Sequence, residues 1–101
     1  MKLKANGIEI NYDKQGSGPV VTLSHSLGCD LRMWDGQAKA LASRYTVLRF
    51  DTRGHGQTSA PEGAYSLEQM ADDLKGLLDG LGVQETHFVG LSMGGMIGQT
   101  F

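Results

Sequence analysis

Hydrophobic and polar residues alternate near the start of the chain. Two short runs of this kind, Lys2–Ala5 and Ile8–Tyr12, lie on either side of the pair Asn6-Gly7. A period of two indicates strands with one buried face, and Asn-Gly favours a tight hairpin turn between strands. The chain is therefore expected to begin with an antiparallel hairpin.

Three later runs are largely apolar and do not alternate. They are Val20–Leu23, Tyr45–Phe50 and Thr86–Leu91. Short continuous runs rich in β-branched residues are typical of strands that are buried on both faces. We therefore expect three buried strands in the body of the fold.

Helical spacing occurs between and after these strands. The stretch Trp34–Ser43 places its apolar residues on one face of a helix, and Met93 begins another helix. The clearest helix starts at Ser66, whose hydroxyl can form a capping box with Gln69, and it should stop at Gly82. Its apolar face comprises Leu67, Met70, Ala71, Leu74, Leu77, Leu78 and Leu81.

Strands that alternate with helices predict an α/β fold. The expected architecture is an antiparallel hairpin leading into a mostly parallel sheet with helices on both faces. In such sheets the functional groups gather at the carboxyl ends of the strands. Three loops at those ends carry unusual residues, namely Ser24–Cys29, Asp51–Ser59 and Gly90–Gly95. These loops are the candidate functional segments.

Composition narrows the possible partners and the compartment. The 101 residues carry a net charge of −2, which argues against nucleic-acid binding and against a polybasic membrane surface. No apolar run is long enough to span a bilayer, and the residues after Met1 lack the apolar stretch of a signal peptide. The single cysteine, Cys29, cannot form an internal disulfide and is expected to be buried. We therefore expect a cytoplasmic protein.

The loop Gly90–Gly95 contains the pattern Gly-x-Ser-x-Gly centred on Ser92. An apolar strand leads into it and a helix-compatible segment follows, as in a nucleophile elbow. A serine on such a turn has a strained backbone, and Gly90 and Gly94 remove collisions that larger residues would make. The helix N-terminus also favours negative charge that develops at Ser92. Ser92 is therefore the candidate catalytic nucleophile; the alternative is a glycine-rich turn that only packs a helix on the sheet.

The loop Ser24–Cys29 is the candidate for stabilising an oxyanion. Acyl transfer needs two donors aimed at the tetrahedral oxyanion, one of them the backbone N–H after the nucleophile, which belongs to Met93. The second donor should come from the loop that follows the adjacent strand, and we assign it to the N–H of Leu27. The alternative is an ordinary turn between a strand and a helix.

In the loop Asp51–Ser59, His55 has one glycine on each side, Gly54 and Gly56. Such a pattern could suggest a phosphate loop or a metal site. The phosphate-loop pattern is absent, and no second histidine or cysteine stands at ligand spacing. We therefore interpret this segment as a tight turn held by Asp51 and Arg53.

Taken together, the three loops resemble a known family. HSLG at 25–28, DTRGHG at 51–56 and GLSMGG at 90–95 occur in this order and at these distances in the α/β-hydrolase superfamily. The resemblance is greatest to β-ketoadipate enol-lactone hydrolases and related esterases. Most superfamily members have His-Gly where this chain has His25-Ser26, and the serine variant resembles the enol-lactonase branch, as does the segment Met33-Trp34-Asp35.

The resemblance implies hydrolysis of a carboxylic ester or lactone through an acyl-enzyme on Ser92, by a Ser-Asp-His triad under a helical cap. It implies no metal and no organic cofactor. Carbon–carbon bond hydrolases and cofactor-free perhydrolases of this fold keep the serine and remain alternatives, as does a non-catalytic hydrolase-like binding or receptor protein. Dehalogenases and epoxide hydrolases of this fold have an aspartate at the position of Ser92.

The base that would activate Ser92 is not evident in the chain. In this fold the acid and the histidine follow the nucleophile, whereas residues 93–101 contain neither. His87 lies on the strand that leads to Ser92 and is roughly 16 Å away at about 3.3 Å per residue. His55 is expected to anchor its own loop. His25 ends the adjacent strand, and we expect it to hold the oxyanion loop by hydrogen bonds instead of acting as a base.

Three residues near the first loop are candidates for lining the substrate pocket. They are His25, Ser26 and Trp34, of which Trp34 could equally belong to the hydrophobic core.

The position of Ser92 near residue 101 leads to an expectation about partners. Residues 1–101 would form a partial α/β-hydrolase core domain, without the cap and the C-terminal half. The strand Thr86–Leu91 would then be an open sheet edge with unpaired backbone groups. We therefore expect pairing with a complementary C-terminal chain that carries the acid and the histidine, or self-association through that edge.

Overall fold

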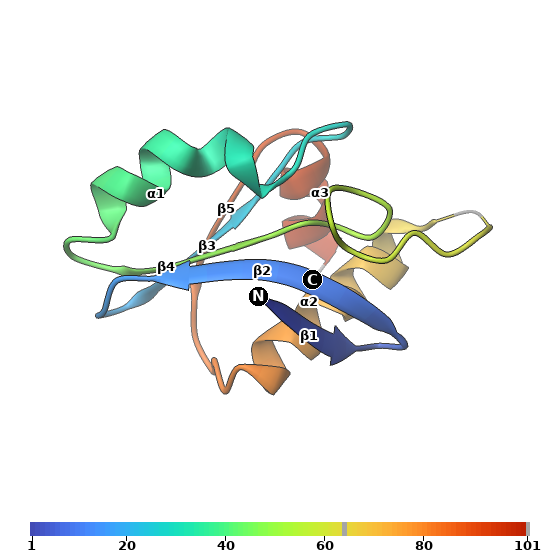
Figure 1. Cartoon of the computed structure of the whole chain (residues 1–101), viewed down its shortest axis with the longest axis horizontal. Helices are drawn as coiled ribbons and strands as arrows, with labels where there is room; N and C mark the ends of the chain where they lie inside the picture. Colours follow the sequence, from blue (N-terminus) through green and yellow to red (C-terminus); the bar gives the residue numbers. More distant parts are fainter. Residues whose placement is uncertain (64, 101) are drawn as a thin grey trace.

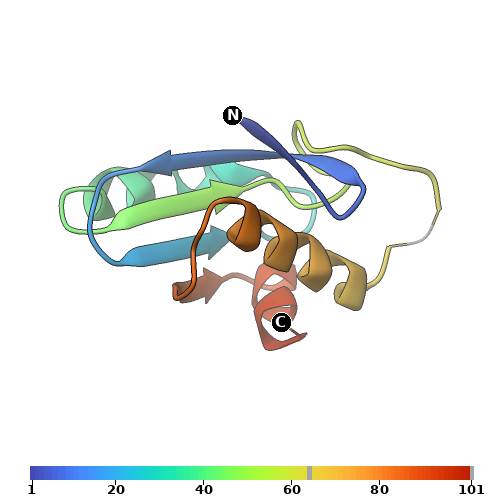
Figure 2. The ribbon, with the colours of Figure 1, turned by 90° about the horizontal axis from the view of Figure 1, so that it is seen from below.

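The computed structural model describes residues 1–63 and 65–100, and it contains one mixed sheet with helices on both faces (Figures 1 and 2). Ala64 and Phe101 lie outside the described residues. Within the described part the strand order is β1-β2-β4-β3-β5. The strands are β1 (Lys2–Ala5), β2 (Ile8–Gln15), β3 (Val20–Ser24), β4 (Thr46–Phe50) and β5 (His87–Gly90). The helices are the 3₁₀ turn η1 (Leu31–Trp34), α1 (Asp35–Leu41), α2 (Leu67–Gly80) and α3 (Met93–Thr100).

The predicted hairpin is confirmed. β1 and β2 pair in antiparallel register, and Asn6 and Gly7 both have positive φ, 50° and 80°, as a two-residue hairpin turn requires. β2 extends to Gln15, beyond the predicted end at Tyr12. It does so because its second half leaves β1 and pairs in antiparallel register with β4.

The parallel part of the sheet brings three loops to one edge. β3 pairs in parallel with β4 on one side and with β5 on the other, and Ser24 lies opposite both Phe50 and Gly90. The three strands therefore end level with one another. The segments that start at His25, Asp51 and Leu91 consequently leave the sheet side by side, as the fold class predicted.

β5 is the open sheet edge that the sequence led us to expect, but its side chains are less buried than predicted for a strand with two buried faces. In the described structure it is an edge strand that pairs only with β3, and it is shorter than the predicted range Thr86–Leu91. The side chain of His87 is exposed, and that of Val89 is 44% exposed. β3 and β4, by contrast, are buried as expected because strands and helices cover them on all sides.

The helices divide the core into two clusters on opposite faces of the sheet (Figure 2). The 3₁₀ turn η1 and α1 replace the single helix predicted over Trp34–Ser43, and they cover one face. Residues of this smaller cluster are Val21, Leu23, Trp34, Ala38 and Val47. α2 and α3 cover the other face, with Leu48, Phe50, Leu74, Leu77 and Ile97 at the centre of the larger cluster.

The predicted ends of α2 are confirmed. The Ser66 hydroxyl accepts a hydrogen bond from the Gln69 N–H at 3.1 Å, which caps the start of the helix. At the other end, the N–H groups of Gly82 and Val83 donate to the carbonyls of Asp79 and Leu78, the pattern of a Schellman motif. The apolar face of α2 is buried between these caps.

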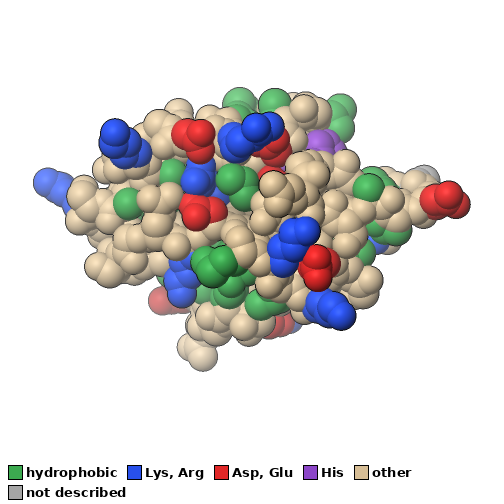
Figure 3. Space-filling view, in the orientation of Figure 1, with side chains coloured by type: hydrophobic (Ala, Val, Ile, Leu, Met, Phe, Trp, Pro, Cys, Tyr) green, Lys and Arg blue, Asp and Glu red, His purple; other side chains and the backbone are tan. Residues whose placement is uncertain are grey.

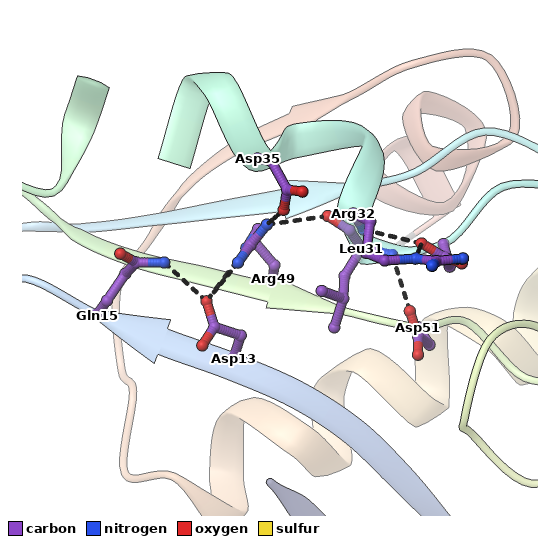
Figure 4. A network of polar contacts seen from close by, with 8 residues as sticks. Asp13, Gln15, Leu31, Arg32, Asp35, Arg49 and Asp51 are labelled. Carbon is purple, nitrogen blue, oxygen red and sulfur yellow. Dashed lines mark hydrogen bonds and ion pairs between the residues drawn. The ribbon is translucent and has the colours of Figure 1, made fainter. Parts of the chain in front are cut away.

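A charged residue in the buried strand β4 is explained by its partners (Figure 4). The Arg49 side chain, which is 9% exposed, pairs with Asp13 of β2 and with Asp35 of α1, and it also donates to the Leu31 carbonyl. A buried guanidinium needs such partners because unpaired burial of its charge would be costly. Arg49 thereby joins β2, β4 and the start of α1.

The surface shows no concentration of one charge on the face drawn in Figure 3, where acidic and basic side chains are dispersed among other residues. In residues 1–63 and 65–100, none of the helices has the length and apolar character needed to cross a membrane.

A buried ion pair connects the loop after β4 to α2. Arg53 donates two hydrogen bonds of 2.8 Å to the Asp73 carboxylate, and the two side chains are 7% and 6% exposed. Asp73 also accepts a hydrogen bond of 2.8 Å from the Asn6 side chain in the hairpin turn. This carboxylate therefore links the hairpin, the second loop and α2.

Replacing Arg53 by alanine should lower the free energy of unfolding by about 3–5 kcal/mol, because the Asp73 charge would stay buried without its partner. The matched control is Lys75→Ala, which breaks the pair Lys75–Asp79 on the same helix. Those side chains are 66% and 65% exposed, so this change should cost less than about 1 kcal/mol. Urea unfolding measures both variants. Equal losses would contradict the importance of the buried pair.

Candidate active site

Ser92 occupies the predicted strained turn between β5 and α3. Its φ is 56°, and in the described part of the chain only Asn6 is another non-glycine residue with positive φ. Asparagine tolerates this region, whereas serine seldom adopts it. The turn is closed by hydrogen bonds from Gly94 N–H to the Leu91 carbonyl and from Met96 N–H to the Ser92 carbonyl. The Ser92 residue is exposed at the tip of this turn.

The two glycines of the pattern allow close approach of backbone segments. A Cβ on Gly90 would lie 2.4 Å from the Gly94 carbonyl carbon, and a Cβ on Gly94 would lie 2.1 Å from the Ser24 carbonyl oxygen. Gly90 therefore makes room for the helix after the turn, and Gly94 lets that helix pack on the end of β3. The predicted reason for both glycines is confirmed, with the additional finding that Gly94 is required by β3.

The loop after β3 contains an exposed residue, Leu27, whose amide is free. The Cys29 N–H donates to the Ser26 carbonyl, the Ser26 N–H to the Met33 thioether, and the Gly28 N–H to Nε2 of His55. Within residues 1–63 and 65–100, the Leu27 N–H has no hydrogen-bond acceptor. The Leu27 side chain is 71% exposed. The loop therefore holds its backbone firmly while leaving this donor available.

A second free amide lies at the start of α3. The Met93 N–H belongs to the first turn of the helix, where no intrahelical acceptor exists, and it has no acceptor elsewhere in the described chain. The Leu91 N–H donates to the Ser24 carbonyl at 3.3 Å, which joins the turn to the end of β3. The two residues assigned to the oxyanion site thus project unpaired N–H groups from adjoining segments.

His25 is completely buried and has both ring nitrogens occupied. Its Nε2 accepts a hydrogen bond from the Thr52 N–H at 2.9 Å, and its Nδ1 lies 2.8 Å from the Ser26 carbonyl oxygen. Because the Thr52 amide can only donate, the ring is neutral with its proton on Nδ1. Burial lowers the pKa of the His25 imidazole, which favours the same neutral form. The prediction that His25 fastens the oxyanion loop by hydrogen bonds is confirmed.

The second loop is held as predicted, by Asp51 and Arg53. The Asp51 carboxylate accepts hydrogen bonds from the backbone of Leu31 and Gln57 and from the side chain of Asn11, all at 2.8–2.9 Å. The bond from Leu31 is drawn in Figure 4. Arg53 adds the ion pair to α2. This carboxylate therefore fixes three segments at the edge of the sheet, and sequence spacing alone would not have found Asn11 or Leu31.

The remaining histidines are placed in different surroundings. The His55 Nδ1 lies 3.1 Å from the Arg53 carbonyl oxygen, so that both of its nitrogens are also engaged. His87 begins β5 and lies opposite Val21, near the start of β3, whereas the turn with Ser92 follows the other end of β5. In the described structure neither of them faces Ser92 as a base.

The pocket candidates are not all brought to Ser92. Ser26 is half-buried, and its hydroxyl donates to the sulfur atoms of Cys29 and Met33. Trp34 lies in the core beneath α1, and in the described structure its Nε1 has no partner. Cys29 is exposed, contrary to the prediction that it is buried. The thioether of Met33 as an acceptor for the Ser26 amide was not anticipated, and no sequence signal would have revealed it.

A cavity of about 800 Å³ lies at the other end of the strands. Its lining residues come from the start of β3, from α2 and from the segment before β5, and they include Pro19, Lys75, Glu85 and His87. Ser92 is not among them. Among residues 1–63 and 65–100, no three histidine, cysteine or carboxylate side chains are grouped as metal ligands would be.

Comparisons with known proteins agree with this geometry. A family model described as alpha/beta hydrolase fold matches residues 19–101. A 3-oxoadipate enol-lactonase from Acinetobacter baylyi is 40% identical over 99 residues, which are 96% of this chain and 37% of that protein. The crystal structure of an enol-lactonase from Burkholderia xenovorans is similar with a TM-score of 0.93 and 45% identity, over 97% of this chain and 39% of that one. A fluoroacetate dehalogenase from a Burkholderia species is 41% identical over 90% of this chain and 32% of its own length.

These similarities confirm the resemblance inferred from the three motifs. The chain spans little more than a third of the length of the curated enol-lactonases that it matches, 37% and 34%.

Adding one methyl group at Gly94 should disrupt the packing of α3 on β3. We expect Gly94→Ala to lower the free energy of unfolding by about 1–3 kcal/mol, because its Cβ would overlap the rigid Ser24 backbone. Gly95→Ala is the matched control, since its Cβ would lie 3.4 Å from the Gly90 carbonyl oxygen. That contact is acceptable, and alanine favours the helix. Chemical denaturation compares the two variants; a more stable Gly94→Ala variant would refute the close approach.

Proposed function

We propose that this chain, which belongs to the α/β-hydrolase fold family, supplies the nucleophile and the oxyanion-binding amides of an enzyme that hydrolyses a carboxylic ester or lactone. The observation that carries the proposal is the arrangement at the edge of the sheet: Ser92 lies on a strained turn with the unpaired Met93 amide, and the loop with the unpaired Leu27 amide leaves the adjacent strand at the same level. Turns that only pack a helix on a sheet do not need a serine at positive φ. The strain is understandable if it presents the hydroxyl to a substrate.

The reaction follows from these groups. The Ser92 Oγ attacks the carbonyl carbon as its proton passes to a base, and the carbonyl oxygen becomes an oxyanion. The N–H groups of Leu27 and Met93 stabilise that charge, and the α3 N-terminus adds a favourable field. As the tetrahedral intermediate collapses, the base returns the proton to the leaving oxygen and an acyl group stays on Ser92. An ester releases its alcohol in this step, whereas a lactone ring opens and keeps the new hydroxyl on the acyl group. Water then hydrolyses this ester by the same steps.

The base and its carboxylate partner are proposed to lie outside these 101 residues. His25 and His55 each have both nitrogens engaged, and His87 stands at the start of β5, at the opposite end of that strand from Ser92. The matched relatives are nearly three times as long as this chain. We infer that residues 1–101 form the N-terminal part of the core domain, and that the acid and the histidine are supplied by the C-terminal part.

The edge of β5 is the proposed site for that C-terminal part. Val89 and the adjoining Leu91 are 44% and 53% exposed, and β5 pairs only with β3 in the described structure. An apolar edge strand offers unpaired backbone groups and a hydrophobic surface to a further strand. A complementary C-terminal chain would cover this edge, and self-association of the chain through the same edge is the alternative.

The nucleophile argues against dehalogenation by this chain. Dehalogenases of the family resemble it but use an aspartate at the position of Ser92, whose carboxylate attacks carbon directly. A serine hydroxyl is suited to acyl transfer.

Because the single cysteine is free and exposed, we also propose a reducing, cytoplasmic setting.

Ser92→Ala should reduce hydrolysis of p-nitrophenyl acetate by the complete enzyme by roughly 10⁴-fold or more, because the acyl-enzyme cannot form. The variant should also lose labelling by a fluorophosphonate, whereas Ser17→Ala, at the opposite end of the sheet, should keep both activity and labelling. Mass spectrometry locates the label. A fluorophosphonate found on another residue of the active enzyme would disprove the assignment.

The substrate preference follows from the likeness to enol-lactonases. We expect the complete enzyme to cleave p-nitrophenyl acetate and small lactones faster than p-nitrophenyl laurate, as measured by kcat/KM. Higher kcat/KM for laurate would show that the similarity does not extend to the substrate.

A further inference from the structure

His55 fixes the loop after β3 that presents the Leu27 amide, although His55 itself lies in the loop after β4. Its Nε2 accepts the Gly28 N–H at 3.1 Å across 27 positions of sequence. We propose that His55 is a positioning residue for the oxyanion site, acting through the peptide between Leu27 and Gly28. This inference rests on the proposed function, since it concerns how the turn that carries the Leu27 donor is held in place.

The geometry of the turn explains why that one hydrogen bond matters. Ser26 to Cys29 form a β-turn closed by the Cys29 N–H and the Ser26 carbonyl, and Gly28 at its third position has a φ of 77°. A positive φ at this position is the mark of a type II turn. Type I and type II turns differ mainly in the orientation of their central peptide, which is here the peptide between Leu27 and Gly28. By accepting the N–H of that peptide, which belongs to Gly28, His55 selects one of the two orientations. The Leu27 N–H belongs to the preceding peptide, between Ser26 and Leu27, and is held because His55 fixes the turn that contains both peptides.

The chemistry of the bond restricts His55 to one protonation state. A backbone amide can only donate, so Nε2 must present its lone pair, and the single ring proton must lie on Nδ1. The Arg53 carbonyl oxygen, 3.1 Å from Nδ1, is the matching acceptor. Each nitrogen therefore has a defined role, and the ring is oriented by both of its partners.

The backbone around His55 is itself held in place. The His55 N–H donates to the Thr52 carbonyl, and the Thr58 N–H donates to the His55 carbonyl. Thr52 is in turn the residue whose amide is accepted by His25, and the two imidazole rings lie 5.1 Å apart. The first and second loops are therefore joined twice, by His25 reaching from the first to the second and by His55 reaching back.

Three substitutions at one position separate this role from general stabilisation. Glutamine can place its Oε1 near the position of Nε2 and accept the Gly28 N–H, whereas asparagine is too short and alanine has no acceptor. In the complete enzyme, His55→Ala and His55→Asn should lower kcat for p-nitrophenyl acetate by roughly 10–100-fold with little change in KM. His55→Gln should restore kcat to within about threefold of the unsubstituted enzyme, because only the acceptor has to be replaced. His87→Gln is the control and should leave kcat unchanged.

Amide exchange of Gly28, followed by NMR on this chain, tests the hydrogen bond without reference to activity. Exchange should accelerate in His55→Ala and His55→Asn and remain slow in His55→Gln. Unchanged exchange in all three variants would overturn the proposal even if the enzyme is a hydrolase. Accelerated exchange with unchanged kcat would also overturn it, by showing that the turn does not position a catalytic donor. If the unsubstituted enzyme has no esterase activity, the proposed function fails, and exchange still decides whether His55 holds the turn.

Discussion

The parallel pairing of β3 with β4 and β5 is the constraint on which the rest of the site depends. Ser24 lies opposite both Phe50 and Gly90, so that the three strands end at one level. Loops that are far apart in the sequence then leave the sheet side by side and can bond to one another. A shift of register by one residue would reverse the faces of the side chains and separate the loops. The strand register therefore decides where the candidate oxyanion donors and the Ser92 turn lie relative to one another, and no single motif could do so alone.

Close approach of α3 to the end of β3 is the second requirement. A residue at positive φ other than glycine or asparagine costs of order 1–3 kcal/mol, and it persists only where its surroundings determine it fully. Around Ser92 these surroundings are the backbone of Ser24, which touches Gly94, and the hydrogen bonds that close the turn. Packing of Ile97 into the larger core cluster holds the helix against the sheet. The free-energy cost of the positive φ at Ser92 is thus offset by the burial of apolar side chains of α3, such as Ile97, in the core.

Electrostatics at the site follows from hydrogen bonding between loops. His25 and His55 each accept a backbone amide, and each is held in the neutral form with its proton on Nδ1. Such rings stabilise loops well but cannot take a proton from Ser92 without giving up a bond that the site needs. The use of both histidines to hold loops is consistent with a family in which the base lies on a later segment of the chain.

The sequence by itself determined what depends on neighbouring residues. The pattern of apolar residues predicted the hairpin and the strands β3 and β4. Ser66 and Gly82 predicted the two ends of α2, and the Gly-x-Ser-x-Gly pattern predicted the strained turn at Ser92. These predictions succeed because turn chemistry and helix capping act within a few positions of the sequence. Only the tertiary structure decided which groups meet across the sheet. It left Val89 of β5 partly exposed, buried Trp34 beneath α1, exposed Cys29 and gave His55 its partner in Gly28. These outcomes depend on contacts between residues far apart in the chain, and local spacing carries no information about such contacts.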